Sequence, residues 1–292
     1  MYRSLEEQCP RFHLYIYAFD DSSYEILCAL NLKHATILSL SEFEDEALLS
    51  VKPLRSVGEY CWTCTPSIIM HAIETYSLDS CTYLDADLYF FSDPGVLVEE
   101  MGDKSILITD HRYTSKYDQS STSGIYCVQF MTFKNDLHGM AALNWWREAC
   151  VKWCYARFED GKFGDQKYLD DWTTRFEGVH VLKNLGGGLA PWNVQQYDLD
   201  KKEFDIVFYH FHGLKLLEHD KVELGHYKLD KVVLRDVYKP YLLHVQAIES
   251  ELVSSCSSYS EDAAISKVDW SWKSPLRALK RRIKGEYNLF KR

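Results

Sequence analysis

Two aspartates separated by one residue, Asp85 and Asp87, have the residue type and spacing that best suit chemistry. They stand in the stretch CTYLDADLYFFSDP, which otherwise reads as the apolar centre of a sheet. Alternation along an extended chain points both carboxylates to the same side. Two such carboxylates repel each other unless a cation joins them, and oxygen ligands favour a hard divalent ion such as Mg²⁺ or Mn²⁺. The pair therefore predicts a metal site, and that ion could in turn hold a diphosphate.

The Asp-x-Asp spacing by itself carries little information. The chain has 23 Asp among 292 residues, so roughly two such matches are expected by chance. A second match, Asp198 to Asp200, lies in a polar stretch typical of a solvated loop. Asp85 differs because it follows a short apolar run, and open α/β sheets bind ligands beyond the carboxyl ends of their strands. The structural alternative is that one aspartate caps a turn and the other pairs with a buried Arg or Lys.

Short apolar runs alternate with helical patterns along the chain, which predicts an α/β fold with a mostly parallel central sheet flanked by helices. The runs 12–19 and 81–84 are expected strands, and 204–213 is expected to be a last strand that ends in a glycine turn. Thr65 followed by Pro66 is typical of a helix start, with Thr as the N-cap.

Composition and charge limit the class of protein. The hydrophobic share of 46% indicates a globular chain. There is neither a run of eighteen apolar residues nor an apolar signal segment at the N-terminus, so we expect no membrane span and no export. Nine cysteines at irregular spacing favour reduced thiols in the cytosol. The net charge of −10 argues against a nucleic-acid partner.

Four segments occur in an order that resembles glycosyltransferase family 8, a group of retaining enzymes with the GT-A fold. The resemblance covers about residues 10 to 220. YLDADLYFFSDP is similar to the metal-binding segment of that family. The three later segments are SGIYCVQF (123–130), similar to its Asn-x-Gly strand with Ser or Thr in place of Asn, FGDQKYLDDW (163–172), similar to its Asp-Gln helix start, and YHFHGLK (209–215), similar to its His-x-x-Gly segment with a following Lys.

The resemblance implies a set of metal ligands. Asp85 and Asp87 would hold Mn²⁺ or Mg²⁺, and His210 would be the third protein ligand. A metal bridging two phosphates stabilises a leaving nucleoside diphosphate as a Lewis acid. His212 is an alternative to His210, because alternation places both on the same side of a strand.

The resemblance also implies residues that contact the donor. Gly213 would let the backbone approach the diphosphate, and Lys215 would neutralise it. Asp165 and Gln166 would lie beneath the anomeric carbon of the sugar, as the catalytic pair. Asp165 also stands where a helix N-cap is expected, which is compatible with that role.

The stretch LGGGLAPWN (185–193) is expected to be a flexible loop that faces the sugar. Gly187 and Gly188 would let its backbone approach the donor, and Trp192 offers a stacking face.

Two departures from the family pattern follow. The family opens with a strand that holds the nucleotide base, and MYRSLEEQCPRF reads as the helix after that strand, so the first strand is expected to be missing. Lys215 is followed by LLE and not by a second basic residue and Pro-Trp. Arg55 or Arg112 could then supply the phosphate contact.

The C-terminal stretch 273–292 carries eight Lys or Arg against one Glu. Its apolar residues recur at spacings of three and four: Leu276, Leu279 and Ile283. A basic amphipathic helix is typical of binding to an anionic membrane surface, and Trp270 and Trp272 just before it suit an interface. The alternative is a solvated charged terminus.

Together these features predict a GT-A-like nucleotide-sugar transferase domain over 1–228, a helical extension over 229–254, a linker over 255–272 and a basic amphipathic tail over 273–292. The expected function is metal-dependent transfer of a sugar, with retention, from a nucleotide-diphosphate donor such as a UDP-sugar. The acceptor would be a saccharide or glycolipid of surface polysaccharide synthesis, at the cytoplasmic, inner face of the membrane. The alternatives are a nucleotidyltransferase, or a non-catalytic relative that binds a nucleotide or a sugar.

Overall fold

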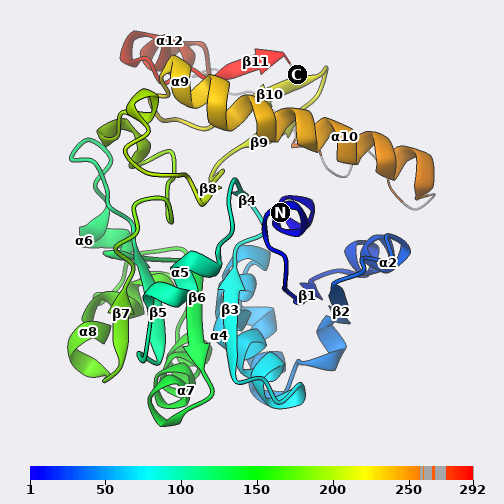
Figure 1. Cartoon of the computed structure of the whole chain (residues 1–292), viewed down its shortest axis with the longest axis vertical. Helices are drawn as coiled ribbons and strands as arrows, with labels where there is room; N and C mark the ends of the chain where they lie inside the picture. The colour runs from blue at the N-terminus through cyan, green and yellow to red at the C-terminus, as the bar shows by residue number, and fades with distance from the viewer. Residues whose placement is uncertain (257–258, 260–264, 267–273, 292) are drawn as a thin grey trace.

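The computed structural model describes residues 1–256, 259, 265–266 and 274–291 (Figure 1). Trp270, Trp272 and most of the predicted linker lie outside the described residues. The strands are β1 Leu14–Ala18, β2 Ala35–Ser39, β3 Ser80–Leu84, β4 Leu88–Phe90, β5 Ile106–Asp110, β6 Tyr126–Lys134, β7 Val179–Val181, β8 Phe208–His210, β9 Lys215–Leu217, β10 Lys221–Glu223 and β11 Leu289–Lys291.

Helices stand between most of these strands. The α-helices are α1 Tyr2–Gln8, α2 Asp21–Ala29, α3 Glu46–Val51, α4 Val57–Thr75, α5 Gly95–Glu100, α6 Ser120–Ser123, α7 Leu137–Lys152, α8 Trp172–Arg175, α9 Lys231–Val233, α10 Lys239–Ser255 and α12 Ser274–Lys284. The short 3₁₀ helices are η1 Leu40–Glu42, η2 Lys52–Leu54, η3 Gln166–Asp171, η4 Val194–Gln196 and η5 Leu199–Lys201, and η6 Leu234–Tyr238 is a π-helical turn.

The predicted α/β class is confirmed, and the sheet is partly parallel. The central sheet has the order β3-β6-β5-β7, in which β5 and β7 are parallel and β6 runs antiparallel to both of its neighbours. β1 and β2 form a parallel pair of their own. With β6 reversed, β3, β5 and β7 run in one direction, so their carboxyl ends open toward the same edge of the sheet.

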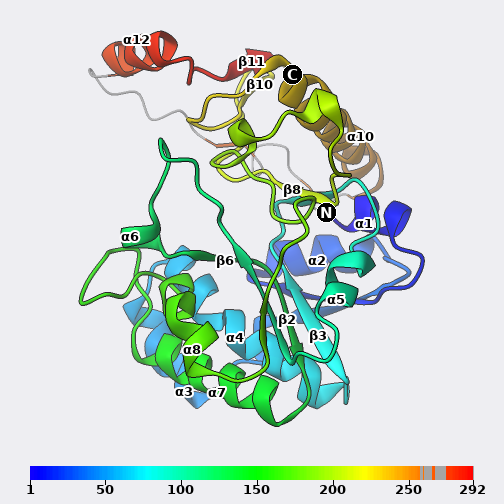
Figure 2. The same cartoon turned by 60° about the vertical axis from the view of Figure 1, so that its left-hand side comes forward.

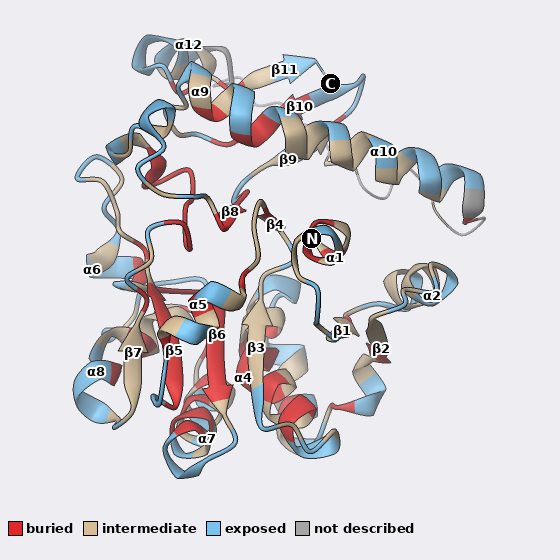
Figure 3. Ribbon diagram, in the orientation of Figure 1, coloured by how far each residue is buried: buried red, intermediate tan, exposed pale blue. Residues whose placement is uncertain are grey.

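The core lies between this sheet and α4 and α7, which pack against each other (Figure 3). Trp146 of α7 and Trp172 of α8 are fully buried, and their rings meet edge to face at 5.6 Å between centroids. Aromatic pairs in this geometry add to the area that they bury.

Helix α4 begins earlier than the Thr65-Pro66 pair predicts, so that prediction is wrong. The helix starts at Val57, and Ser56 and Glu59 form a capping box ahead of it. Pro66 therefore lies inside the helix, where its ring nitrogen cannot donate a backbone hydrogen bond. The capping box satisfies the amides of Ser56 and Glu59. Helix α4 buries side chains both before and after Pro66, and this packing holds the helix together through the proline.

A second layer lies above the carboxyl edge of the sheet (Figures 1 and 2). It contains the antiparallel sheet β9-β10-β11 together with α9, η6 and α10. Its apolar cluster includes Tyr209 of β8, Val222 of β10 and Tyr238 of η6, so the helical extension packs on residues that precede it. The π-helical turn ends directly before α10, whose first turn contains Pro240.

The basic C-terminal stretch forms helix α12 and then returns to the body of the protein. β11 pairs antiparallel with β10, and Arg281 forms an ion pair with Glu223 at 2.6 Å. Glu286 accepts a hydrogen bond from Tyr117 at 3.3 Å and pairs with Lys116 at 2.7 Å. The described part of this stretch is thus fixed at its end, while α12 exposes its apolar side chains.

Candidate metal site

The end of β3 places the first aspartate. Asp85 follows Leu84, and its amide donates to the carbonyl oxygen of Gln129 on β6 at 3.0 Å. The Leu88 amide then donates to the Asp85 carbonyl at 3.3 Å, which closes a turn between β3 and β4. Asp85 therefore stands at the carboxyl edge of the sheet, as the sequence predicts.

The pairing of β4 with β8 brings the second aspartate next to a histidine far along the chain. In the antiparallel register Leu88 is opposite His210, and the Phe211 amide donates to the Asp87 carbonyl at 3.0 Å. A slip of this register by one residue would turn the His210 side chain to the other face.

Asp85, Asp87 and His210 form a cluster in which one ligand atom of each residue lies within 4.8 Å of the others. His210 Nε2 is 3.0 Å from Asp87 Oδ1 and 3.8 Å from Asp85 Oδ2. His210 is buried, with 6% of its side chain exposed, whereas 45% of the Asp87 side chain faces solvent. Two carboxylate oxygens and one imidazole nitrogen suit Mn²⁺ or Mg²⁺, and the open side leaves room for further oxygen ligands.

The alternative histidine is not part of this cluster. His212 is exposed, and within the described residues the potential ligand atoms group the two aspartates with His210 alone. The structural alternative was an ion pair between one aspartate and a buried Arg or Lys. Among the described residues neither aspartate forms such a pair, and the ion-pair partner of both is His210.

Gln129 orients the His210 ring. Its Oε1 lies 2.7 Å from His210 Nδ1, and the Gln129 side chain is fully buried. An amide oxygen only accepts, so Nδ1 carries a proton. In the charged ring Nε2 also carries a proton and donates to Asp87, and in the neutral ring its lone pair is free for a cation. Tyr83 holds the other side of the site, because its hydroxyl donates to Asp85 Oδ1 at 2.9 Å. Sequence reasoning included Gln129 in the segment 123–130 but assigned it no role.

Burial and mutual charge perturb all three groups. Burial raises the pKa of Asp85, and the Asp87 charge adds to this increase while His210 opposes it. Burial also acts to raise the pKa of Asp87, but the charge and hydrogen bond of His210 outweigh it, so that pKa is lowered. Burial acts to lower the pKa of His210, and Asp87 reverses this, so that pKa is raised. The two carboxylates thus draw a positive charge to this point, which is what a cation site requires.

Asp165 and Gln166 lie at the start of η3. Asp165 is 5% exposed, and its side chain makes no capping hydrogen bond although it occupies the N-cap position. Its backbone oxygen accepts from Trp146 Nε1 at 2.9 Å. Burial, with the Asp85 charge as the second cause, raises the pKa of Asp165 to about 7. Asp165 therefore shares the electrostatic field of the metal cluster, while its catalytic role and that of Gln166 stay predictions.

Gly213 and Lys215 lie in the turn after β8. Gly213 has φ of +77°, a conformation that favours glycine, and Lys215 is exposed at the start of β9. Their proposed contacts with a diphosphate stay predictions. Arg55 and Arg112 are already engaged with protein groups. The Arg55 guanidinium lies 3.9 Å from the centre of the Tyr155 ring, and Arg112 donates to the carbonyl oxygens of Gly187 and Leu185.

The glycine-rich stretch 185–193 is packed against the protein, which corrects the expectation of a flexible loop. Residues 186–193 are all buried. A Cβ at Gly186 would meet the Asp205 carbonyl oxygen at 2.0 Å, and one at Gly187 would meet Leu97 Cδ1 at 2.8 Å. Gly188 has φ of +85°, and a Cβ there would meet Thr109 Cγ2 at 2.7 Å. These glycines therefore let other atoms of the protein approach the backbone closely. Contact of Gly187 and Gly188 with a nucleotide-sugar donor stays a prediction.

Trp192 forms one wall beside the cluster. Its side chain is 4% exposed, and its ring meets the His210 ring edge to face at 5.3 Å. Its Nε1 donates to the carbonyl oxygen of His111, which follows β5. Cys127 is buried near the same histidines. Burial acts to raise the pKa of its thiol, but His111 and His210 outweigh this and lower the pKa to about 7. Sequence reasoning included Cys127 in the segment 123–130 but assigned it no role, and it did not identify His111, which lies in none of the four segments.

The fold and site define an α/β protein with a carboxylate–histidine cluster at the carboxyl edge of its sheet. The chain is 32% identical to YfnD of Bacillus subtilis (strain 168) over 277 residues, which cover 89% of this chain and 88% of YfnD. It therefore belongs to the same family as YfnD. YfnF of the same organism is 28% identical over 263 residues, with 84% of this chain and 87% of YfnF covered. No family model matches the sequence.

Two solved structures are also similar. Mouse xyloside xylosyltransferase 1 in its apo form matches with a TM-score of 0.45 and 14% identity, over 72% of this chain and 89% of that one. A glycosyltransferase involved in the glycosylation of the major capsid of PBCV-1 matches with a TM-score of 0.41 and 11% identity, over 70% and 94%. At these TM-scores the likeness supports no functional conclusion.

Within the described residues, no helix has both the length and the apolar composition needed to cross a membrane.

Proposed function

We propose that the protein is a metal-dependent glycosyltransferase that transfers a sugar from a nucleotide-diphosphate donor. The observation that carries this proposal is the convergence of Asp85, Asp87 and His210 from two distant segments into one cluster. When bound, Mn²⁺ or Mg²⁺ would neutralise the diphosphate that leaves. The ordered sequence segments support the GT-A fold and retention of configuration.

The chain's own residues would divide the remaining work. Gln129 and Tyr83 orient the ligands, and Lys215 would add a positive charge for the diphosphate. Trp192 would limit the space beside the sugar. Asp165 and Gln166 would face the anomeric carbon as the catalytic pair. The donor we propose is a UDP-sugar, and the acceptor is a saccharide or glycolipid of surface polysaccharide synthesis.

We also propose that the protein works at the inner face of the membrane in the cytoplasm. The support is α12, a helix with five Lys or Arg whose apolar residues Leu276, Leu279 and Ile283 are 65%, 56% and 79% exposed. An amphipathic helix of this kind suits an anionic surface. A glycolipid acceptor would then be available at the same surface.

A panel of nucleotide sugars tests the transferase reaction. Purified protein should hydrolyse or bind one UDP-sugar in the presence of Mn²⁺, and chelation with EDTA should abolish this. Asp87→Ala should reduce the activity by at least about 100-fold, because removal of a ligand from a metal site costs affinity as well as activity.

Asp198→Ala is the matched control, because Asp198 belongs to the second Asp-x-Asp pattern and is exposed. That variant should keep full activity. Binding of a nucleotide sugar that needs no metal and survives Asp87→Ala would favour a non-catalytic binding protein. Release of pyrophosphate from a nucleoside triphosphate would favour a nucleotidyltransferase.

A further inference from the structure

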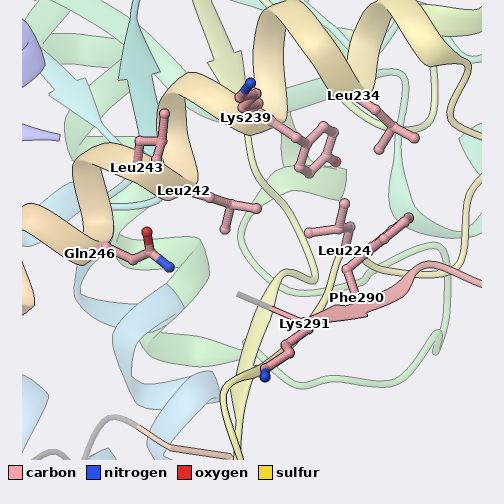
Figure 4. A pocket seen from close by; sticks show the side chains of 9 residues that line it. Leu224, Leu234, Lys239, Leu242, Leu243, Gln246, Phe290 and Lys291 are labelled. Atoms are coloured by element: carbon pink, nitrogen blue, oxygen red, sulfur yellow. The ribbon is translucent and has the colours of Figure 1, made fainter.

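An apolar groove lies between α10 and β11 in the second layer (Figure 4). Its volume is about 260 Å³. Leu224 and Tyr238 form a buried floor, with 2% and 1% of their surface exposed. Leu243 and Phe290 form the two sides and are 57% and 41% exposed. The groove is thus open to solvent along a lining that is almost entirely hydrocarbon.

Two lysines stand at opposite sides of this groove. In Figure 4, Leu242 and Phe290 point into the groove, while the amino groups of Lys239 and Lys291 point outward at its upper and lower edges. Both lysines are exposed, and in the described part of the chain neither forms an ion pair with a carboxylate. An apolar trough between two ammonium groups is complementary to a molecule with an apolar chain and an anionic head.

The lining selects against a peptide as the occupant. Apart from the lysines, the Tyr238 hydroxyl and the Gln246 amide are the polar side-chain groups along the groove. A peptide would bring a donor and an acceptor with each residue, and most of these would stay unsatisfied when buried. A hydrocarbon chain has no such groups, and its burial is favourable in proportion to its area.

The site of the groove also favours a lipid. Phe290, which lines one side of the groove, belongs to β11 and lies six residues after the end of α12. Helix α12 itself has exposed apolar residues and five Lys or Arg. We propose that the groove binds the hydrocarbon chain of an anionic lipid, with the charged headgroup held by Lys239 and Lys291. This site is separate from the metal cluster and does not depend on sugar transfer.

Dodecyl phosphate, used below its micellar concentration, is a suitable soluble probe. Isothermal titration of the full chain, without metal or nucleotide sugar, should show one bound molecule per chain. Leu243→Asp and Lys239→Glu should each weaken this binding by about tenfold, since both residues are exposed and their replacement changes the groove while leaving the core intact. Inorganic phosphate alone should show no measurable binding.

Controls separate the groove from general detergent binding. Leu49→Asp changes an aliphatic residue on α3 that is 50% exposed, and it should leave the affinity unchanged. Leu279→Asp on α12 should also leave the affinity unchanged. Equal binding to wild type and Leu243→Asp would overturn the proposal. Loss of binding in Leu279→Asp would overturn it too, because it would show that the dodecyl chain binds to α12 and not to the groove. A concentration-dependent dimer that Leu243→Asp abolishes would assign the groove to a second copy and overturn it too.

Discussion

The hydrogen bond between Gln129 and His210 decides which ring nitrogen faces the carboxylates. With Nδ1 held by Oε1 at 2.7 Å, Nε2 is the nitrogen left for Asp87 and for a cation. The partner of a metal-ligating histidine is commonly a carboxylate or a carbonyl, and its loss weakens metal binding. If His210 binds a metal, as we propose, Gln129 would be a positioning residue that acts through His210.

Gln129→Leu should weaken Mn²⁺ binding by about 10- to 100-fold, because it removes the acceptor from His210 Nδ1. Gln129→Glu keeps an acceptor at that atom and should keep most of the affinity. Titration of free Mn²⁺ by electron paramagnetic resonance measures both variants. The ¹⁵N shifts of His210 should show a changed tautomer in Gln129→Leu alone, and an unchanged tautomer with unchanged affinity would refute the role.

At this scale the sequence predicted the cluster of Asp85, Asp87 and His210 better than its surroundings. Asp85, Asp87 and His210 belong to ordered motifs, and their convergence was expected. Gln129 and Cys127 lie on β6 at positions where any buried side chain would fit the pattern of a strand. Their closeness to His210 follows from the pairing of distant segments, which the spacing of residues along the chain does not reveal.

Among the secondary-structure elements, the stretch 185–193 shows how a glycine run can be misread. Gly-rich segments read as flexible, yet this one lies between β5 and β8, and the Val207 and His210 amides donate to its carbonyl oxygens. Asn193 donates to the carbonyl oxygens of His111 and Gly188 at 2.9 Å and so fixes the turn. The glycines are required because other protein atoms occupy the space of their missing side chains. The Thr65-Pro66 pair misplaces the start of α4 for a related reason, because Ser56 and Glu59 already cap the helix and its buried side chains continue past Pro66.

Gly188→Ala should destabilise the protein by about 2 to 4 kcal/mol, because it adds an overlap with Thr109 and Arg112 to the strain of a positive φ. Gly161→Ala is the matched control, with φ of +74° and no atom within 4 Å of the added Cβ. It should cost only the backbone strain, about 1 kcal/mol. Urea unfolding of both variants gives the comparison. Equal losses would show that the stretch 185–193 can move away, as a flexible loop would.

For the whole molecule, the distribution of charge separates two functions. The chain carries a net charge of −10, while its last twenty residues carry eight Lys or Arg. The structure fixes the end of this stretch by the pairing of β11 with β10 and by the contacts of Glu286 with Lys116 and Tyr117. A membrane contact through α12 would therefore hold the folded body close to the surface, because β11, which follows α12, is paired with β10. Removal of the entire stretch would also remove β11, so point changes on α12 are the sharper test.

The paired change Leu279→Asp and Ile283→Asp should abolish sedimentation with vesicles that contain anionic lipid, because it places two carboxylates in the apolar face of α12. Each replaced side chain is more than half exposed, so the fold should be kept, and circular dichroism checks this. Leu54→Asp with Val57→Asp is the control, because these residues are 63% and 82% exposed on another part of the surface and the change in charge is the same. Wild type and the control should bind, and binding should fall as salt rises, since the cations of α12 act on charged headgroups that salt screens. Equal sedimentation of the α12 variant and the control would remove α12 as the membrane contact, and it would leave the metal cluster and its proposed reaction untouched.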